Sequence, residues 1–375
     1  MPVAALAQTN QPPRDAQPAS SNVQGGQYPK IDPERRAYFR IVAPDAKHVS
    51  VSLPGGDRMS QGTDGVWTVT TEPLAPGFHY YSITVDGAAV SDPASQSYFG
   101  TGKMSSGIEV PSPGEDFYLP QDVPHGDVRA HYYFAGSTGL IRRCFVYTPP
   151  GYDTNLAARY PVLYLQHGMG EDATSWPRQG RAGFIMDNLI AAGKAKPMLV
   201  VMDDGGITPG AMSGPRRGGG PAFWDKFGQM LIQDIIPMID STYRTIPDRD
   251  HRAMAGLSLG GTQTMEITQA HLDEFAYIGV FSAPFGFPQV PRGFNGLLGD
   301  PAAFARQVKV LFISYGTAGD LASRGTLRFH QELERAGIKH VFYQSPGTSH
   351  EWQTWRRSLY EFGPLLFQDT HDDHR

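Results

Sequence analysis

The sequence is poor in cysteine, in long apolar runs and in clusters of basic residues. It contains a single cysteine in 375 residues, Cys144, so no disulfide can form within the chain, and its alternating surroundings predict an inert core position. No apolar run is long enough to cross a membrane, so no membrane partner is expected. The 32 basic and 37 acidic residues give a formal charge of −5 without a basic cluster, and binding to nucleic acid is therefore not expected.

The first 28 residues carry no apolar period of a helix or a strand. Residues 1–8 resemble the end of a secretory signal, with small residues before a cleavage site, which predicts a secreted or periplasmic protein. The stretch from Gln8 to about Gln27 is rich in Gln, Pro, Ser and Asn, a composition typical of disordered segments. Residues 1–28 are therefore expected to be a signal remnant and a disordered linker.

Residues 29–108 show short alternating runs separated by turn residues. Such strands at regular spacing predict an all-β, immunoglobulin-like sandwich. Its aromatic residues could bind a sugar, but alternation buries every second side chain of a strand, and we favour the interpretation that half of them fill the core. These residues are Trp67, Phe78, Tyr80 and Tyr81. Residues 109–126, rich in Pro, Gly and acids, are expected to be a linker.

Residues 127–370 contain the most informative motif of the chain, Gly256-Leu257-Ser258-Leu259-Gly260. An apolar run precedes it and a helix-like stretch follows it, so the serine is expected at a sharp turn between strand and helix. A serine held at such a turn exposes its Oγ as a nucleophile for acyl transfer. Glycine and serine are common, so the motif by itself could also be a plain Gly-rich turn.

An acid and a base, the partners of such a serine, follow later in the chain in the order that this arrangement requires. Asp320 comes just after the apolar run 308–314, where open α/β sheets place their chemistry, although it could also cap the next helix. His350 follows the last expected strand and carries an imidazole that can take the serine proton and return it. Glu332 and Asp300 are alternative acids, but neither follows a strand so directly.

An oxyanion formed at the ester carbonyl needs two backbone N–H donors. One is expected from Leu259, the residue after the nucleophile, and the other from the loop that follows the early strand 161–165. We favour Met169 for the second donor, with Gly168 as the alternative. His167 is expected to be buried and to brace this loop.

Several ordered motifs between about Gly126 and Phe367 resemble carbohydrate esterase family 1, the esterase-D-like group of feruloyl and acetylxylan esterases. The matching motifs are Tyr147 to Tyr152, Leu165 to Gly168, Asp234 to Pro237, Ile239 to Arg244, Ala255 to Gly261, Tyr315-Gly316 with Asp320, Ser349 to Trp352 and Trp355-Arg356. The N-terminal third is similar to family 48 carbohydrate-binding modules, through its Ala43-Pro44-Asp45-Ala46, Asp64-Gly65-Val66-Trp67 and Val85-Asp86-Gly87 segments.

The resemblance implies an α/β-hydrolase domain, a mostly parallel sheet flanked by helices, preceded by the immunoglobulin-like sandwich. It implies a serine esterase without metal or organic cofactor that acts on a plant cell-wall polysaccharide or its feruloylated or acetylated oligosaccharides. Ferulate on arabinoxylan is the favoured substrate, and acetate on xylan is the alternative. An enterochelin-esterase-like hydrolase, and a glycan-binding protein with an inactive esterase domain, are further alternatives.

Four aromatic residues are expected to line the site for the acyl group, namely Trp176, Trp224, Phe285 and Trp352. Each could equally be a core residue. The Gly-rich segment 205–220 follows an expected strand, and it could form one wall of the site or a plain surface loop.

Overall fold

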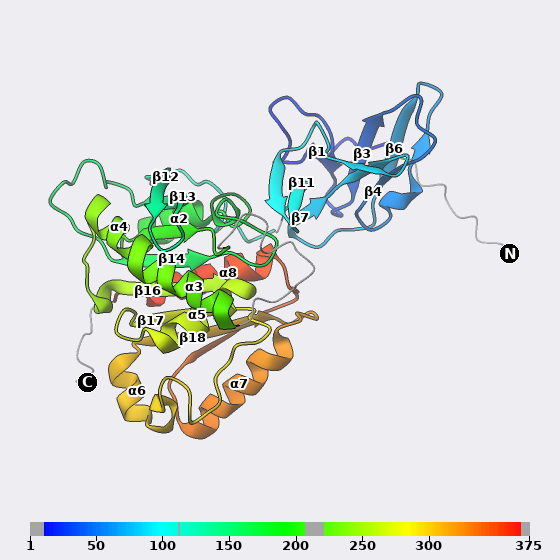
Figure 1. The fold of residues 1–375 in the computed structure, drawn as a ribbon. Helices are drawn as coiled ribbons and strands as arrows, with labels where there is room; N and C mark the ends of the chain where they lie inside the picture. The colour runs from blue at the N-terminus through cyan, green and yellow to red at the C-terminus, as the bar shows by residue number, and fades with distance from the viewer. Residues whose placement is uncertain (1–10, 112, 207–220, 369–375) are drawn as a thin grey trace. The chain divides into compact units, whose positions relative to one another are not determined.

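The computed structural model describes residues 11–111, 113–206 and 221–368, apart from the side chains of residues 221–225. The chain forms two compact units, Met1–Asp116 and Phe117–Arg375. The first is built of strands and the second of strands and helices (Figure 1).

The first unit consists of short antiparallel strands in three sheets. Trp67, Phe78 and Tyr81 are buried in it, so three of the four aromatic residues considered for sugar binding are core residues. The sheets are β1 (Gln17–Pro18), β2 (Lys30–Ile31), β3 (Ala37–Val42), β6 (Val66–Thr70) and β5 (Ser60–Gln61); β4 (Val49–Val51), β8 (Ile83–Val85) and β9 (Ala88–Val90); and β10 (Ser97–Gly100), β11 (Lys103–Val110) and β7 (Gly77–Tyr81).

The predicted disordered linker is wrong for the residues from about Ala16 onward. Strand β1 pairs with β2, Ala16 and Ala19 are buried, and the Ser21 hydroxyl accepts a hydrogen bond from the Glu109 N–H. This segment is held by small buried residues and by isolated hydrogen bonds. Such contacts leave no repeating apolar pattern in the sequence, so the pattern could not predict them.

Asp32 is a buried carboxylate that ties β2 to β3 in the first unit. It accepts hydrogen bonds from the backbone N–H and the guanidinium of Arg36 and from the Tyr38 hydroxyl. Burial by itself raises the pKa of Asp32, but these donors outweigh it and leave the pKa below its ordinary 3.8. The folded first unit therefore favours the ionised carboxylate.

The second unit is built on one eight-stranded sheet in the order β12-β13-β15-β14-β16-β17-β18-β19. The strands from β15 onward in this order are parallel, and β13 pairs antiparallel with both β12 and β15. Their bounds are β12 (Asp127–Ala135), β13 (Leu140–Thr148), β14 (Val162–Gln166), β15 (Leu199–Asp203), β16 (Arg252–Leu257), β17 (Tyr277–Phe281), β18 (Val310–Gly316) and β19 (Val341–Ser345).

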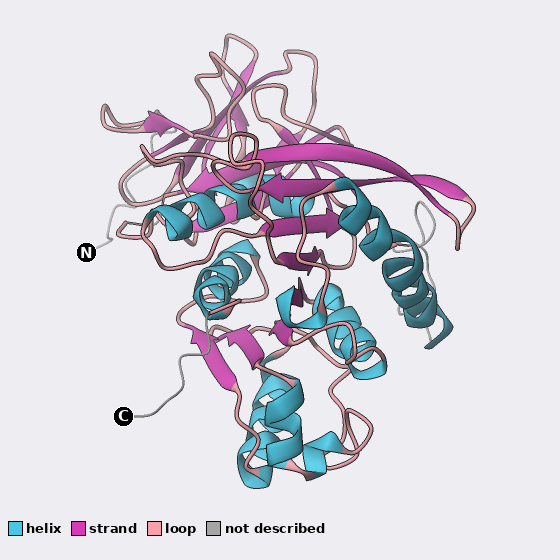
Figure 2. Cartoon of the chain, turned by 90° about the vertical axis from the view of Figure 1, so that its left-hand side faces the viewer, coloured by secondary structure: helices cyan, strands magenta, loops and turns pink. Residues whose placement is uncertain are grey.

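Helices cover both faces of this sheet (Figure 2). Helix α5 packs on β16 and β17, while α8 and α2 pack together and α8 lies against β17 to β19. The helices are α1 (Ser175–Arg178), α2 (Ala182–Ala191), α3 (Pro221–Met230), the π-helical turn η2 (Leu231–Ile235), α4 (Ile236–Thr242), α5 (Leu259–Ala270), α6 (Pro301–Gln307), α7 (Ser323–Ala336) and α8 (Trp352–Phe362); short 3-10 turns are η1 (Gly56–Arg58), η3 (Arg249–His251), η4 (Leu297–Gly299) and η5 (Gly363–Leu365).

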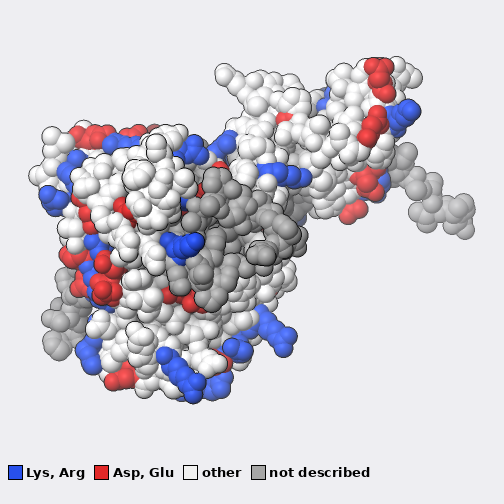
Figure 3. Space-filling view, in the orientation of Figure 1, with Lys and Arg blue, Asp and Glu red and all other residues white. Residues whose placement is uncertain are grey.

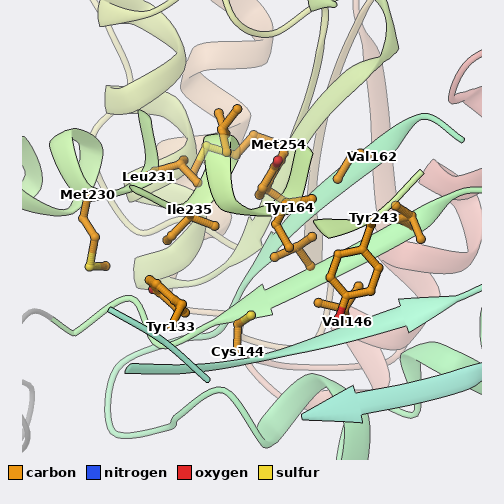
Figure 4. Close-up of a cluster of buried hydrophobic side chains, with 14 of the residues drawn as sticks. Tyr133, Cys144, Val146, Val162, Tyr164, Met230, Leu231, Ile235, Tyr243 and Met254 are labelled. Carbon is orange, nitrogen blue, oxygen red and sulfur yellow. The ribbon is translucent and has the colours of Figure 1, made fainter. Parts of the chain in front are cut away.

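A large apolar cluster joins the sheet to the segment α3–η2–α4. Met230, Leu231 and Ile235 from this segment face Val146 and Met254 of the strands (Figure 4). Cys144 lies in the same cluster, and burial raises the pKa of its thiol. Strand β16, which leads to Ser258, is therefore held with β12 to β15 by a closely packed core.

The second unit begins before the predicted boundary at residue 127. Tyr118 is buried, and the Asn188 side chain of α2 donates to the carbonyls of Phe117 and Leu119, each over 2.9 Å. The predicted linker 109–126 is therefore corrected, because β11 extends to Val110 and the stretch from Phe117 belongs to the second unit.

The described part of the chain contains no helix that is both long and apolar enough to cross a membrane. Basic and acidic side chains are interspersed over the face drawn in Figure 3.

Candidate active site

Ser258 lies at a strained turn between β16 and α5. Its backbone has φ 51° and ψ −116°, an unusual conformation for a residue with a side chain. The Ser258 N–H donates to the carbonyl of Phe281 on the neighbouring strand over 2.7 Å, which helps to hold the turn. This is the geometry expected of a nucleophile at an elbow.

The glycines on either side of Ser258 are required by close backbone contacts. A Cβ on Gly256 would lie 2.4 Å from backbone atoms of Gly260, and a Cβ on Gly260 would lie 2.4 Å from the carbonyl oxygen of His167. Backbone atoms cannot move aside as a flexible side chain can. The motif is therefore a packing requirement as well as a sequence pattern.

The structure brings Ser258, His350 and Asp320 together. His350 Nε2 lies 2.9 Å from Ser258 Oγ, and His350 Nδ1 lies 2.8 Å from Asp320 Oδ1. The three residues follow β16, β19 and β18, so they meet at the carboxyl edge of the parallel strands. The alternative acids serve elsewhere: Asp300 caps α6, and Glu332 pairs with an arginine one turn earlier on α7.

Asp320 is a buried carboxylate surrounded by donors. Besides His350 it accepts hydrogen bonds from the backbone N–H groups of Gly316 and Ala322, each over 2.9 Å, and from the Ser282 hydroxyl over 2.6 Å. Burial by itself raises the pKa of Asp320, but the hydrogen bonds from His350, Gly316, Ser282 and Ala322 lower it below the ordinary value. Asp320 is thus kept ionised, and its charge faces the imidazole.

Ser282 is a site residue that the sequence did not reveal. It directly follows β17, is fully buried and has a φ of 51°, like Ser258. Its hydroxyl donates a hydrogen bond to Asp320 Oδ2, whereas His350 Nδ1 lies against Asp320 Oδ1. A serine at the carboxyl end of the strand next to the nucleophile strand is the only signal that could have indicated it.

Two backbone N–H groups near Ser258 are candidates for holding an oxyanion. Leu259 is the first residue of α5, where helical N–H groups have no partner within the helix. Met169 lies in the loop after β14 and is 42% exposed. The alternative, Gly168, directs its N–H at Glu171 Oε2 over 3.4 Å, which favours Met169.

His167 lies at the base of this loop and is buried. Its Nδ1–H donates to the Gly168 carbonyl over 2.8 Å, and its Nε2 accepts from the Gly205 N–H over 3.1 Å. With both ring nitrogens engaged by backbone groups, the side chain links the loops after β14 and β15. This agrees with the bracing role expected from the sequence.

The four aromatic residues predicted to line the site have different surroundings. Trp176 and Trp352 are corrected to core residues, because they are 1% and 2% exposed and pack edge to face with ring centroids 5.4 Å apart. Phe285 is 47% exposed, and its carbonyl accepts from Thr262 on α5, so it stays a candidate. The Trp224 side chain lies outside the described residues, as do residues 207–220 of the Gly-rich segment 205–220.

A cavity of about 260 Å³ lies beside the loops that follow β14 and β15. Asp172 and Asp204 supply carboxylates from these two loops, and the β12–β13 hairpin supplies aromatic and basic side chains. Tyr132 of the hairpin is 65% exposed. The lining residues are Tyr132, Leu140, Ile141, Arg142, Arg143, Asp172, Ala173 and Asp204.

The parallel sheet, the strained serine after β16 and the acid and histidine after β18 and β19 define an α/β-hydrolase. The model of the Esterase family, described as "Putative esterase", matches residues 135–364, and the chain belongs to this family.

The relatives agree with this family. The chain is 41% identical to an endo-1,4-beta-xylanase/feruloyl esterase of Xylanibacter ruminicola over 95% of its own length and 48% of the relative. It is 25% identical to endo-1,4-beta-xylanase Y of Acetivibrio thermocellus, over 76% of this chain and 27% of that one. The chain thus spans about half or less of these curated relatives.

Solved structures show the same fold. A ferulic acid esterase from Anaeromyces mucronatus, solved with ferulic acid, matches 68% of this chain and 95% of its own, with a TM-score of 0.57 and 25% identity. Enterochelin esterase from Shigella flexneri matches 89% of this chain and 92% of its own, with a TM-score of 0.62 and 16% identity, a likeness of fold alone.

Proposed function

We propose that this chain is a feruloyl esterase that hydrolyses hydroxycinnamate esters of plant cell-wall polysaccharides, ferulate on arabinoxylan in particular. The observation that carries the proposal is the hydrogen-bonded series Ser258–His350–Asp320 at the carboxyl edge of the sheet. The acyl group is taken from the relatives, since one is named a xylanase/feruloyl esterase and another is a ferulic acid esterase.

In the first half of the reaction, Ser258 Oγ attacks the ester carbonyl while its proton passes to His350 Nε2. The negative charge of Asp320 stabilises the imidazolium that forms. The carbonyl oxygen becomes an oxyanion, held by the N–H groups of Leu259 and Met169. The ester C–O bond then breaks, His350 returns its proton to the leaving alcohol oxygen of the sugar, and the acyl group stays on Ser258.

In the second half, water enters in place of the sugar. His350 takes a proton from it as the water oxygen attacks the acyl carbonyl. The bond from the carbonyl carbon to Ser258 Oγ breaks, and the proton on His350 goes to Oγ. Ferulate leaves as the free acid, and the enzyme returns to its first state.

We assign the two ends of the substrate to two different surfaces of the second unit. Phe285, half-exposed and tied to α5, is the candidate wall for the phenolic ring. The cavity beside Asp172 and Asp204 offers carboxylates and the exposed Tyr132, which suit the hydroxyl groups and ring faces of a sugar. A plant cell-wall polysaccharide lies outside the cell, so the proposed substrate also implies that the enzyme acts outside the cytoplasm, in a secreted or periplasmic form.

The test compares the parent with Ser258→Ala on methyl ferulate, nitrophenyl acetate, acetylated xylan and enterochelin. We expect ferulate release by the parent, with a higher kcat/KM than acetate release from xylan. We expect kcat to fall by at least about 10⁴-fold in the variant, because Ser258, His350 and Asp320 act as a unit and cannot work without the nucleophile. Ser314→Ala is the matched control, because it also removes a serine hydroxyl at the sheet, but one that is buried and bonded to Ser358 instead of His350.

Each other result selects a different conclusion. A well-folded Ser258→Ala variant with most of its activity would overturn the mechanism. Acetate release from xylan without ferulate release would make the chain an acetylxylan esterase. Enterochelin hydrolysis without either would favour that alternative, and a folded parent inactive on every ester would favour a glycan-binding protein.

A further inference from the structure

A second cluster of functional side chains lies where α7 ends and β19 begins. His330 and Glu334 are one turn apart on α7, so they share a face of the helix. The chain turns back after Ala336, the last residue of α7, and His340 lies against them just before β19. One ligand atom from each of the three lies within 4.8 Å of the others.

We propose that His330, Glu334 and His340 bind one transition-metal ion, with zinc as the expected ion. Two imidazole nitrogens and one carboxylate oxygen are ligands that zinc takes in tetrahedral sites, with water in the fourth position. Calcium and magnesium prefer oxygen ligands throughout, so this donor set does not suit them.

The hydrogen bonds of His340 leave the required nitrogen free to act as a ligand. Its Nδ1 lies 2.8 Å from the Ile338 carbonyl oxygen, which can only accept, so Nδ1 carries the hydrogen. Nε2 then has a lone pair, and it points at His330 Nδ1 over 2.8 Å. A histidine whose second nitrogen donates to a backbone carbonyl is the usual arrangement around a bound metal.

The other imidazole is held in place by stacking. The ring of His330 lies on the ring of Phe342 from β19, with centroids 3.8 Å apart and planes 5° from parallel. Without metal, His330 Nδ1–H donates to His340 Nε2. When an ion binds, the hydrogen on His330 Nδ1 is lost to solvent and one is gained at His330 Nε2, so the ring stays neutral. The lone pairs of His330 Nδ1 and His340 Nε2 then both bind the ion.

The position of the cluster predicts its effect. His340 precedes the amino end of β19, whereas Ser258, Asp320 and His350 follow carboxyl ends of strands, so the two sites lie at opposite edges of the sheet. The ion would join the end of α7 to the start of β19. We therefore expect it to stabilise the second unit and to take no part in ester hydrolysis.

The experiment is a calorimetric titration of zinc chloride into the full chain, made without a histidine tag and freed of metal by chelator and dialysis. We expect one ion per chain and a Tm that rises with zinc. Glu334→Gln and His340→Ala should each weaken binding by about tenfold or more. Glu334 is exposed, so its variant should fold even where the histidine variant does not.

The controls are residues of the same types outside the cluster. Glu332→Gln lies on the same helix, and His251→Ala removes a histidine that pairs with Asp248. Both should bind zinc as the parent does. No heat of binding in the parent, or equal affinity in parent and Glu334→Gln, would overturn the proposed site. A fall in kcat/KM in Glu334→Gln would contradict its purely structural role.

Discussion

Ser282 provides a specific test of how the acid of the candidate site is held. Ser282→Ala removes the hydroxyl donor to Asp320 Oδ2 and leaves the carboxylate its hydrogen bonds from Gly316, Ala322 and His350. A hydrogen bond to a charged group contributes roughly 1.5–3 kcal/mol. Because three donors remain, we take the lower end and expect kcat/KM to fall about tenfold, which corresponds to ~1.4 kcal/mol.

The assay is a double-mutant cycle with Asp320→Asn, measured as kcat/KM on methyl ferulate. If Ser282 acts through the charge of Asp320, its loss should matter little once that charge is gone, and the effect in the Asp320→Asn background should be less than about twofold. A serine that only fills space would cause the same loss in both backgrounds.

The control for Ser282→Ala is again Ser314→Ala, another buried serine one strand away. Its hydroxyl pairs with Ser358 over 2.9 Å and does not contact Asp320, so we expect its kcat/KM to stay near that of the parent. Parent-like activity of Ser282→Ala at an unchanged Tm would refute the positioning role. So would equal losses in the two arms of the cycle.

Further predictions concern packing, charge and substrate. Gly260→Ala should abolish activity or folding, because its Cβ meets backbone, whereas Gly183→Ala on α2, with its nearest neighbours 3.4 Å or more away, should stay active; expression yield and kcat/KM check this. Asp32→Asn should lower the Tm of the first unit at pH 7. Because the folded pKa of Asp32 lies below 3.8, its contribution is present above that pH and is lost as pH falls through the folded value, so the Tm values of parent and variant should converge as pH falls below 3.8. Tyr132→Ala should reduce ferulate release from arabinoxylan several-fold more than from methyl ferulate, and equal losses on both would remove the cavity from the proposed sugar site.

Local patterns were enough to predict which residues meet at the candidate site. The elbow is encoded within five residues, and Asp320 and His350 each follow an apolar run that became a strand, β18 and β19. Parallel strands end at one edge of a sheet, so the order of the motifs in sequence also gave their meeting place. The α/β-hydrolase fold was predictable for the same reason.

The side chains that depend on packing direction were not predictable. Trp176 and Trp352 follow strands as the triad residues do, but they turn into the core, and no periodicity fixes that choice in a short segment. The contact of His330 with His340 spans only ten residues, but it depends on how the chain turns back between α7 and β19. Ser282 meets Asp320 through a contact between residues 38 positions apart in sequence. Such contacts require the register of the sheet, which the sequence does not state.

The edge of the sheet repeats one construction on neighbouring strands. Ser258 follows β16 and donates its N–H to Phe281 of β17, and Ser282 follows β17 and donates its N–H to Ser314 of β18. Both serines have a φ of 51°, a conformation that costs energy in a residue with a side chain. The backbone hydrogen bond that each serine makes to the next strand stabilises its strained turn. The Ser258 hydroxyl then lies against His350, and the Ser282 hydroxyl donates to Asp320. Ser258 and Asp320, at the two ends of the hydrogen-bonded series, are therefore positioned by the same sheet register, so a change that shifts β17 should disturb the proposed nucleophile and the proposed acid together.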